Sequence, residues 1–421
     1  MPHQRPCILL LSPHCSYRLA PYLNAAQKLN LDAIVVSQGE HSLVSAVASG
    51  IHIDFDHPDV LGQVTAAVTD RDIKTVIGTD DRTVELAAEL SKSFGLNFND
   101  PQSIRYTRRK DLARVCLRHS AVNIPDFQII TLDETDKKIT CEIDFPVVVK
   151  PIALSGSRGV IRANSHEEFT AALQCLQTIL EQTDQHDEKN KALVERYIPG
   201  YEYAYEGLLQ HGELMTLAIF DKPDLMEGPY FEETYYITPS RLSPAIQQAI
   251  KEAVSAACLA YGLQQGPIHA EVKLYDDKIW FIEMASRTVG GQCARLFSYA
   301  TGLSLEETVL AQAAGLSIKQ APMQDAAGVL MIPIKKRGLL RRVEGLLQAS
   351  KVEFIEDIEI SIQEGYELVP LPEGDSYLGF IFAKAPTPGQ VEQALRDAYD
   401  MINIITTPLL HTTEWQSFGQ D

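Results

Sequence analysis

The sequence predicts an α/β fold distributed over more than one domain, and three observations support this prediction. The chain has 421 residues. A chain of this length is too long to fold around one ordinary hydrophobic core, so we expect two to four domains. About the first hundred residues alternate short apolar runs with helical patterns, which is typical of a parallel α/β layer. From about residue 325 the pattern changes to strand-like runs followed by one helix, which predicts a separate small α+β unit.

The composition restricts the class of function. Hydrophobic residues make up 45% of the chain and charged residues 22%, as in soluble globular proteins. The formal net charge is -19, so the protein repels nucleic acid and anionic membranes, and an anionic ligand must be held by local positive groups. We therefore expect neither a nucleic-acid nor a membrane partner.

The cysteines and the apolar runs predict a cytoplasmic location. Seven cysteines are scattered without a C-x-x-C pair, which argues against a disulfide framework or a zinc site and favours a reducing compartment. The apolar stretch Cys7 to Leu11 is too short for a signal-peptide core, and no run approaches the roughly 18 residues of a membrane span.

The first elements follow from the spacing of apolar residues. Strands are predicted at residues 7–12, 32–37 and 75–81, with helical patterns at 17–29 and 84–95. No GxGxxG follows the first strand, so the dinucleotide fingerprint is missing. Residues 107–119 predict another helix, with Thr107 as its N-cap and one apolar stripe: Leu112, Val115 and Cys116.

Lys110 falls in the first turn of that helix, where the helix dipole disfavours a cation. A bound phosphate would explain its position, and the alternative is a solvated lysine beside two arginines. Lys150 ends the strand-like run 147–150 and is followed by a glycine-rich loop. Backbone N–H groups in such a loop form an anion site. The segment suits a phosphate chain, although GxxxxGK[ST] is absent, and the alternative is a solvated turn.

Later helices carry clear end signals. Ser165 and Glu168 have the spacing of a capping box before a helix that continues to Leu180. Ser243 and Pro244 begin a helix that ends at Tyr261 before Gly262. Two further helices are predicted at 304–314 and 387–401.

Residues 267–284 predict a β-hairpin with one polar face. Ile268, Ala270, Val272 and Leu274 would form the core face, and His269, Glu271, Lys273 and Tyr275 the polar face. A three-residue turn at 276–278 would place Glu271 opposite Glu283 and add Trp280, Ile282 and Met284 to the core face. Facing carboxylates repel each other, so the pair predicts a bound cation, and oxygen ligands favour Mg²⁺ over zinc. The alternative is two exposed glutamates paired with lysines.

Two further segments carry candidate groups. Arg287 follows Glu283 by four residues and precedes Gly290 and Gly291. Its guanidinium could hold a carboxylate or stabilise an oxyanion, and the alternative is a surface salt bridge. The segment 194–203 offers backbone groups to a purine edge and a carboxylate to ribose hydroxyls, although alone this is weak evidence.

From about residue 5 to 315 the chain resembles the ATP-grasp superfamily. The resemblance rests on the order and spacing of six motifs: Lys110, FPVVVKP, SGSRGV, VERYIPGYE, HAEVK and IEMASRTVGG. The H-x-E-x-K strand, the ATGLSLEETVLAQAAG helix and the C-terminal unit resemble the group of L-amino-acid ligases that make dipeptides. The resemblance implies a Rossmann-like domain at 1–105, an ATP-grasp domain at 106–320 with a lid at about 145–205, and an α+β domain at 321–421.

The resemblance also implies roles for individual residues. Lys110 and Lys150 would hold the α and β phosphates of ATP, and Glu271 and Glu283 would coordinate Mg²⁺. The mobile loop over the phosphates would be Ser155, Gly156, Ser157, Arg158 and Gly159. Glu195 with the main chain of Arg196 and Ile198 would meet adenine, and Glu202 the ribose. The catalytic residues would be Arg287, Lys150 and Glu283, and the substrate contacts Glu233, Tyr236, His269, Arg287, Gly290 and Gly291.

Two departures from the family pattern bear on the site. Many members read E-x-N-x-R, where this chain has Ala285 in place of the asparagine, so the amide ligand to a second Mg²⁺ is missing. In the loop 228–242, Tyr236 stands where relatives often place a histidine. Tyr235, Tyr236, Gln292 and Arg295 are candidates for the substrate pocket.

The expected reaction is ATP-dependent amide formation. A carboxylate would be activated as an acylphosphate with one or two Mg²⁺ ions, for which Mn²⁺ could substitute, and an amine would displace phosphate. The substrates would be two amino acids, or an amino acid and a small amine, and the protein a homodimer. The alternatives are an ATP-grasp carboxylase or nucleotide-biosynthesis ligase, and a non-catalytic nucleotide-binding protein.

Overall fold

The computed structural model describes residues 5–14, 16–38, 50–132, 139–183 and 189–409. The N-terminal part is the predicted parallel layer, a four-stranded sheet in the order β3-β2-β1-β4. Its elements are β1 (Cys7–Ser12), α1 (Leu19–Lys28), β2 (Asp32–Ser37), β3 (Gly50–His52), α3 (Val60–Ala67), β4 (Ile73–Gly78) and α4 (Val84–Ser93). All six residues of β1 are buried, as expected of a central parallel strand.

Two short helices lead from this layer to the rest of the molecule, α5 (Pro101–Arg108) and α6 (Lys110–Leu117). The prediction of one helix capped by Thr107 is wrong, because the extended backbone of Arg109 breaks the helix. The Thr107 hydroxyl bonds within α5 to the Ile104 carbonyl. The predicted stripe is also wrong, since Val115 is exposed and the buried residues of α6 are Asp111, Ala113, Arg114 and Leu117. Lys110 does lie in the first turn of α6.

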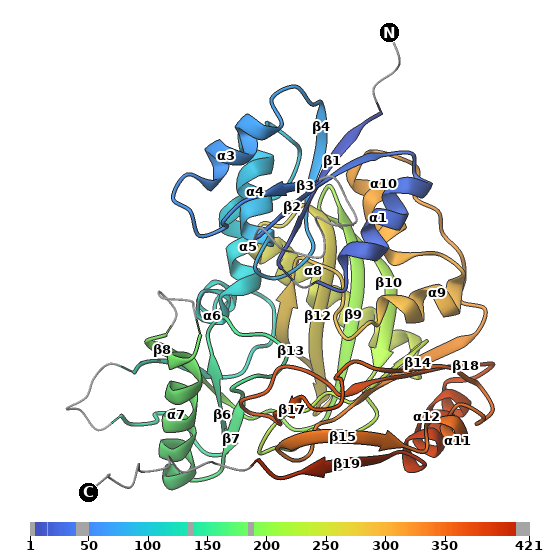
Figure 1. Ribbon diagram of the computed structural model, residues 1–421. Helices are drawn as coiled ribbons and strands as arrows, with labels where there is room; N and C mark the ends of the chain where they lie inside the picture. Colours follow the sequence, from blue (N-terminus) through green and yellow to red (C-terminus); the bar gives the residue numbers. More distant parts are fainter. Residues whose placement is uncertain (1–4, 15, 39–49, 133–138, 184–188, 410–421) are drawn as a thin grey trace, which may run out of the picture.

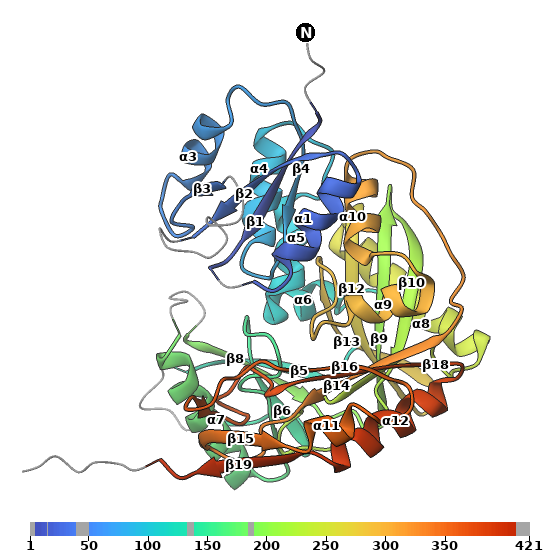
Figure 2. The ribbon, with the colours of Figure 1, turned by 45° about the vertical axis from the view of Figure 1, so that its right-hand side comes forward.

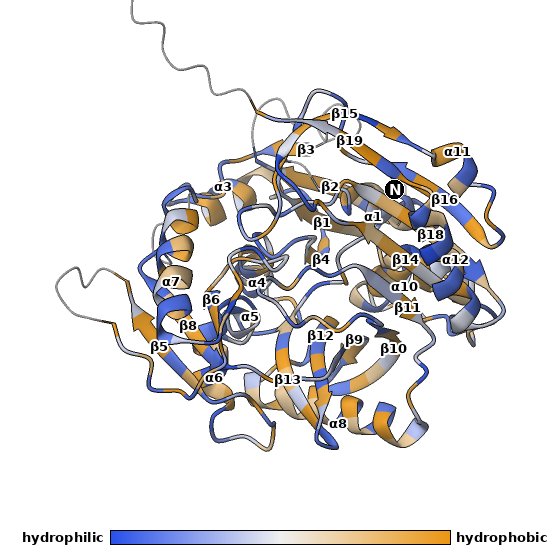
Figure 3. Cartoon of the chain, turned by 90° about the horizontal axis from the view of Figure 1, so that it is seen from below, coloured by the Kyte–Doolittle hydropathy of each residue, from blue (hydrophilic) through white to orange (hydrophobic). Residues whose placement is uncertain are grey.

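A second four-stranded sheet, which we call the lid because it contains most of the segment 145–205 expected to form one, has the order β5-β8-β6-β7. It contains β5 (Phe127–Thr131), β6 (Val147–Pro151), β7 (Ile161–Ala163), α7 (His166–Glu181) and β8 (Lys191–Arg196). Ser165 caps α7 by accepting from the N–H of Glu168. Hydrophobic and hydrophilic residues both occur along α7 (Figure 3), and its apolar side packs on the sheet through Phe169, Leu173, Leu176 and Leu180. The lid sheet thus begins at Phe127, earlier than predicted.

The largest sheet has eight strands in the order β13-β12-β9-β10-β11-β14-β18-β16. These are β9 (Tyr201–Gln210), β10 (Glu213–Asp221), β11 (Tyr235–Thr238), β12 (Gln265–Tyr275), β13 (Lys278–Ala285), β14 (Ala326–Ile332), β16 (Ile355–Ile360) and β18 (Gly379–Ala385). Helices α8 (Pro244–Tyr261), α9 (Ala294–Thr301) and α10 (Leu305–Ala313) belong to the same region. The predicted end signals of α8 are confirmed, because Ser243 accepts from the N–H of Ile246 and Gly262 has φ of 74°.

The C-terminal unit does not form a separate body. Its β14, β16 and β18 extend the large sheet, and α12 (Pro388–Asp400) packs against β14 and β18 (Figure 2). A three-stranded sheet of β17 (Glu367–Leu368), β15 (Gly338–Glu344) and β19 (Asn403–Thr407) lies at the lower edge, with α11 (Leu346–Ala349) nearby (Figure 1). The boundary predicted at residue 321 therefore divides one continuous sheet.

The hairpin β12–β13 has the predicted pairing of Glu271 with Glu283, but for a different reason. The turn has two residues, Asp276 and Asp277, both with positive φ, and a register shift beside Glu271 restores the pairing. The assignment of Trp280 and Ile282 to the core face is wrong, because the two-residue turn sets Ile279 and Phe281 opposite Leu274 and Val272, and only the shift after Phe281 returns Met284 to the core face. Ile279, Phe281 and Met284 are the core residues of β13.

Among the described helices, none is both long and apolar enough to cross a bilayer. The six described cysteines are all free.

Candidate functional site

A cavity of about 570 Å³ lies between the N-terminal layer, the lid, the large sheet and the C-terminal unit. Its size is within the range of small-molecule sites, roughly 300–1,000 Å³. Most of the predicted site residues line it, and they come from segments far apart in the sequence: Lys110, Lys150, Ser155, Gly156, Ser157, Glu195, Arg196, Ile198, Glu202, Glu233, Tyr236, His269, Glu271, Glu283, Arg287, Gly290 and Gly291. Tyr235 and Arg295, two candidates for the substrate pocket, do not line this cavity.

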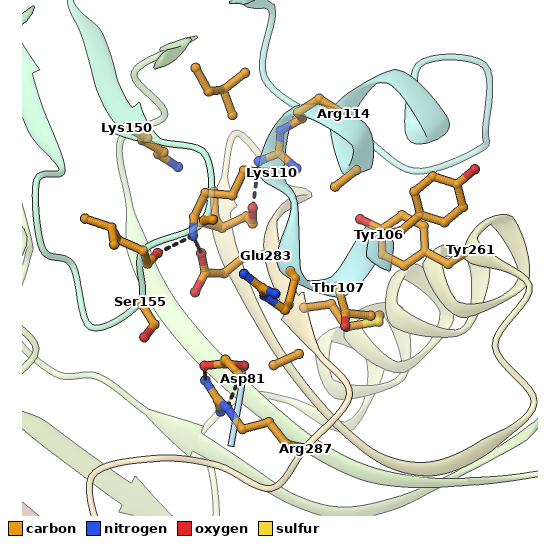
Figure 4. A pocket seen from close by; sticks show the side chains of 18 of the residues that line it. Asp81, Tyr106, Thr107, Lys110, Arg114, Lys150, Ser155, Tyr261, Glu283 and Arg287 are labelled. Carbon is orange, nitrogen blue, oxygen red and sulfur yellow. Dashed lines mark hydrogen bonds and ion pairs between the residues drawn. The ribbon is translucent and has the colours of Figure 1, made fainter. Parts of the chain in front are cut away.

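Two lysines, Lys110 and Lys150, line both this cavity and the neighbouring pocket that Figure 4 shows. Lys110 Nζ lies 3.3 Å from Glu283 Oε2 and donates to the Leu154 carbonyl at 2.9 Å. Lys150 Nζ lies 2.6 Å from Glu195 Oε2. The two ammonium groups thus approach the cavity from different elements, one from α6 and the other from the end of β6. This arrangement matches the expectation that an anionic ligand is held by local positive groups.

Glu195 is buried between two cations, Lys150 and Arg114. Burial alone would raise the pKa of Glu195, but the charges of Arg114 and Lys150 outweigh it and bring that pKa to about 2. Arg114 also donates to the Ile282 carbonyl at 2.6 Å, which ties α6 to β13. The carboxylate therefore fixes the position of Lys150, and the adenine contact expected of Glu195 stays a prediction.

The glycine-rich loop follows Lys150 and contacts the C-terminal unit. Gly156, Ser157 and Gly159 all have positive φ, the conformation that glycine adopts without strain. The N–H of Gly159 donates to the Pro372 carbonyl at 2.9 Å, and Arg158 Nε donates to the Glu373 carbonyl at 3.0 Å. Ser155 to Ser157 line the cavity, whereas Arg158 and Gly159 hold the loop against residues 372–373.

An apolar wall forms the neighbouring part of the cavity. Val148, Tyr197 and Phe231 pack together as one cluster, with Met226 against it. Lys273 Nζ donates to the Ile198 carbonyl at 3.2 Å, which fixes the backbone just after the end of β8. A flat aromatic ring fits such a wall.

Three carboxylates on three strands or loops converge on Lys222, which the sequence analysis did not identify. Lys222 Nζ lies 2.7 Å from Glu202, 2.8 Å from Glu233 and 2.7 Å from Glu271. Tyr236 donates to Glu233 at 2.8 Å. Burial and the neighbouring Glu271 raise the pKa of Glu233. The only signal in the sequence is a lysine directly after the strand β10, and such lysines are common.

His269 lies between two carboxylates. Its Nδ1 is 3.3 Å from Glu206 Oε2 and its Nε2 is 3.9 Å from Glu271 Oε1. Glu206 is buried and also accepts from the N–H of Val289. Glu206 therefore connects His269 with the segment that leads to Gly290, and the sequence analysis missed it because a glutamate within β9 has no motif.

Arg287 forms a two-pronged ion pair with Asp81 of the N-terminal layer (Figure 4). Arg287 Nε donates to Asp81 Oδ1 at 2.9 Å, and the second bond, from a terminal nitrogen to Oδ2, is 2.7 Å long. Arg18 holds the adjacent Asp80 at 3.5 Å. The alternative of a surface salt bridge for Arg287 is excluded, since its side chain is 12% exposed and lines the cavity. Asp81 follows β4, and no motif in the sequence marks it as a partner of Arg287.

Comparisons with known proteins identify two kinds of domain in this chain. Residues 143–295 match the ATP-grasp domain, and residues 330–407 match L-amino acid ligase C-terminal domain 2. The fold is therefore the ATP-grasp fold. A crystal structure of L-amino acid ligase from Bacillus licheniformis superposes with a TM-score of 0.82 at 22% identity, covering 96% of this chain and 100% of that one.

Two curated relatives match part of their length. Alanine--anticapsin ligase of Bacillus amyloliquefaciens is 24% identical over 278 residues, 62% of this chain and 58% of the relative. Dapdiamide A synthase of Enterobacter agglomerans is 26% identical over 245 residues, 57% of this chain and 56% of the relative. The matches thus span less than two thirds of either relative.

Proposed function

We propose that this chain, which joins an ATP-grasp domain to an L-amino acid ligase C-terminal domain, is an ADP-forming ligase of carboxylates and amines. Its substrates would be two amino acids, or an amino acid and a small amine. The observation that carries the proposal is one cavity that contains Lys110, Lys150, a glycine loop, the Glu271–Glu283 pair and Arg287. The relatives named as ligases above support the same chemistry.

ATP would bind between the lid and the large sheet. The two lysines and the N–H groups of the glycine loop supply positive charge for the phosphates, and the apolar wall near Tyr197 and Phe231 accommodates the base. Glu195 keeps Lys150 in place. In-line attack of a carboxylate on the γ-phosphate would give an acylphosphate, with the ammonium groups stabilising the charge on the departing ADP.

Glu271 and Glu283 fit a magnesium ion because they are paired across two strands and provide hard oxygen ligands. When bound, Mg²⁺ neutralises phosphate charge and orients the nucleotide. Ala285 provides no amide oxygen, so a second ion would lack that ligand.

Arg287 would stabilise the oxyanion that forms when the amine attacks the acyl carbon. Asp81 holds the guanidinium by its Nε edge, so the orientation of Arg287 depends on the N-terminal layer. The glycine loop, held against residues 372–373, would exclude water, which would otherwise hydrolyse the acylphosphate.

The test is mass spectrometry of the products formed from ATP, Mg²⁺ and a mixture of all amino acids, together with assay of ADP. We expect at least one dipeptide or amino-acid amide, formed in equal amount to ADP. Comparison of amino-acid pairs with bicarbonate separates this function from the carboxylase alternative. ATP binding without turnover across a broad panel of amines would contradict the proposal and favour the non-catalytic alternative.

We further expect small-molecule partners only, a homodimer and a cytoplasmic location. Light scattering coupled to size-exclusion chromatography measures the oligomeric state, and a monomeric mass would contradict the homodimer.

A further inference from the structure

We infer that Lys222 is a positioning residue that acts as a resident cation, holding one oxygen of Glu271 and leaving the other for the metal ion. The inference rests on the proposed function, in which Glu271 is a ligand of the metal ion. It concerns a residue that lies outside the lysines and glutamates of the ATP-grasp pattern described above.

The contacts of Lys222 use its whole hydrogen-bonding capacity. An ammonium group has three donors, and Lys222 Nζ has three carboxylate partners at 2.7–2.8 Å, on Glu202, Glu233 and Glu271. Its side chain is 3% exposed. Lys222 therefore has no donor left for a phosphate in this arrangement, and it differs in that respect from Lys110 and Lys150.

The three carboxylates need a cation at this position. One oxygen from each lies within 4.8 Å of the others, and each side chain is largely buried. Like charges this close repel strongly where water is excluded. Lys222 compensates them without a metal ion, so Glu202 and Glu233 keep fixed positions beside Glu271 before nucleotide binds.

The contacts at Glu271 distinguish its two oxygens. Lys222 Nζ at 2.7 Å, Tyr236 Oη at 3.4 Å and His269 Nε2 at 3.9 Å all approach Oε1. None of these three groups has its contact with Oε2. Since Glu271 pairs with Glu283 across the hairpin, Oε2 is the oxygen left for an ion that the two glutamates share.

This arrangement gives Lys222 a second effect. Three carboxylate oxygens within 4.8 Å of one another would suit a divalent ion, but the ammonium occupies their centre. Lys222 thereby keeps the metal from settling among Glu202, Glu233 and Glu271, away from Glu283 and the phosphate lysines.

The test measures Mn²⁺ binding to the full chain by calorimetry, without ATP or substrates, so its outcome does not depend on ligase activity. Lys222→Met removes the ammonium but keeps much of the side-chain volume. We expect it to bind Mn²⁺ at least tenfold more tightly than the natural chain. Lys222→Met with Glu202→Gln returns the cluster to its original net charge and should lose that gain. A folded Lys222→Met protein with unchanged Mn²⁺ affinity would overturn the inference.

Lys384→Met is the matched control, because Lys384 is a partly buried lysine of the same sheet that pairs with Asp325 and does not line the cavity. Its Mn²⁺ affinity should be unchanged. If Lys222→Met is unfolded or has a lowered melting temperature, the melting temperature of the double variant shows whether the lost charge is the cause. Recovery of several degrees on adding Glu202→Gln supports a charge-compensating role, and no recovery shows that Lys222 only fills space.

A kinetic measurement separates positioning from general structural damage. A damaged fold lowers the active fraction and therefore kcat alone. Loss of the resident cation should lower kcat and also lower the half-saturating concentration of free Mg²⁺, because the local potential becomes more negative. A fall in kcat with an unchanged Mg²⁺ requirement would count against the inference.

Discussion

At the scale of single residues, the site is organised by buried charges that hold one another. Glu195 fixes Lys150, Asp81 fixes Arg287 and Glu206 fixes His269. Breaking such a pair by removing one partner leaves an uncompensated charge, which is costly in a buried position. The residues that hold the proposed site groups are therefore as important for the geometry as the groups themselves.

Glu283→Gln tests the expected metal ligand. The change keeps the shape of the side chain and removes its charge, so ADP release should fall at least a hundredfold with every substrate, because Mg²⁺ loses one of its two protein carboxylates. Steady-state ADP release measures this effect. Glu252→Gln, on the exposed surface of α8, is the control and should be active. Normal turnover in Glu283→Gln would remove the metal assignment.

Asp81→Asn tests the support of Arg287. An amide keeps the size of the side chain but replaces a charge-assisted pair with a weaker one, so kcat for amide formation should fall about tenfold or more, with little change in KM for ATP. Asp277→Asn, at the exposed hairpin turn, should behave like the natural chain. A changed KM for ATP with an unchanged kcat would argue against this role of Asp81.

The ionisation of Glu195 makes stability depend on pH. Its pKa in the folded protein is about 2 and its ordinary value is 4.5. The folded state thus favours the ionised form, and this stabilisation is present above pH 4.5 and is lost as the pH falls toward 2, a difference on the order of 3 kcal/mol. Urea unfolding between pH 7 and pH 3 measures it. Glu195→Gln should be less stable at pH 7 and should lose less stability on acidification; an equal loss would contradict the assignment.

At the scale of elements, the hairpin β12–β13 and the turn before β9 place the carboxylates. The register shift beside Glu271 turns Glu283 toward the cavity while Phe281 and Met284 stay in the core. Gly200 precedes β9 with φ of 96°, and a Cβ there would lie 2.3 Å from the Leu274 carbonyl oxygen. The close approach of these two backbones sets the position of Glu202.

Gly200→Ala should therefore destabilise the protein by about 1–3 kcal/mol, because it combines a positive φ with a backbone clash. The free energy of unfolding in urea measures the effect. Gly389→Ala is the control, since Gly389 lies in the first turn of α12, has no positive φ, and an added Cβ would contact nothing within 4 Å. That variant should be as stable as the natural chain or slightly more stable. Equal stabilities of the two variants would contradict this reading of Gly200.

At the scale of the whole molecule, four parts of the chain surround one cavity. The N-terminal layer contributes Asp81, the lid Lys150, the large sheet Glu271, and the C-terminal unit Tyr377 and other residues. Because β14 pairs with β11 inside the eight-stranded sheet, the C-terminal unit is required to complete the sheet as well as the cavity.

A fragment ending at residue 320 tests this continuity. It would leave β11 as an unpaired edge and expose Tyr235 and Ile237, which pack with the C-terminal unit, so we expect it to aggregate. The soluble fraction after expression, compared with the full chain, measures this. A soluble fragment with cooperative unfolding would show that residues 321–421 fold separately after all.

Local sequence patterns were enough to predict most of the named elements and the order of the motifs. Local spacing identified the capped helices α7, α8, α10 and α12, the parallel layer and the hairpin, because helix ends and side-chain alternation depend on neighbours within a few residues. The same spacing located Lys110, Lys150, Glu271, Glu283 and Arg287. It failed at the break in α5–α6 and at the hairpin bulge, where contacts with other elements outweigh local preference.

The ion pairs between distant residues could be seen only in three dimensions. Asp81 and Arg287 are 206 positions apart, and Lys222 and Glu271 are 49 apart. Such pairs leave no periodic pattern, because their members belong to different elements that are brought together by packing. The partners that orient the predicted residues, and the sharing of one sheet by two apparent domains, therefore became visible only in three dimensions.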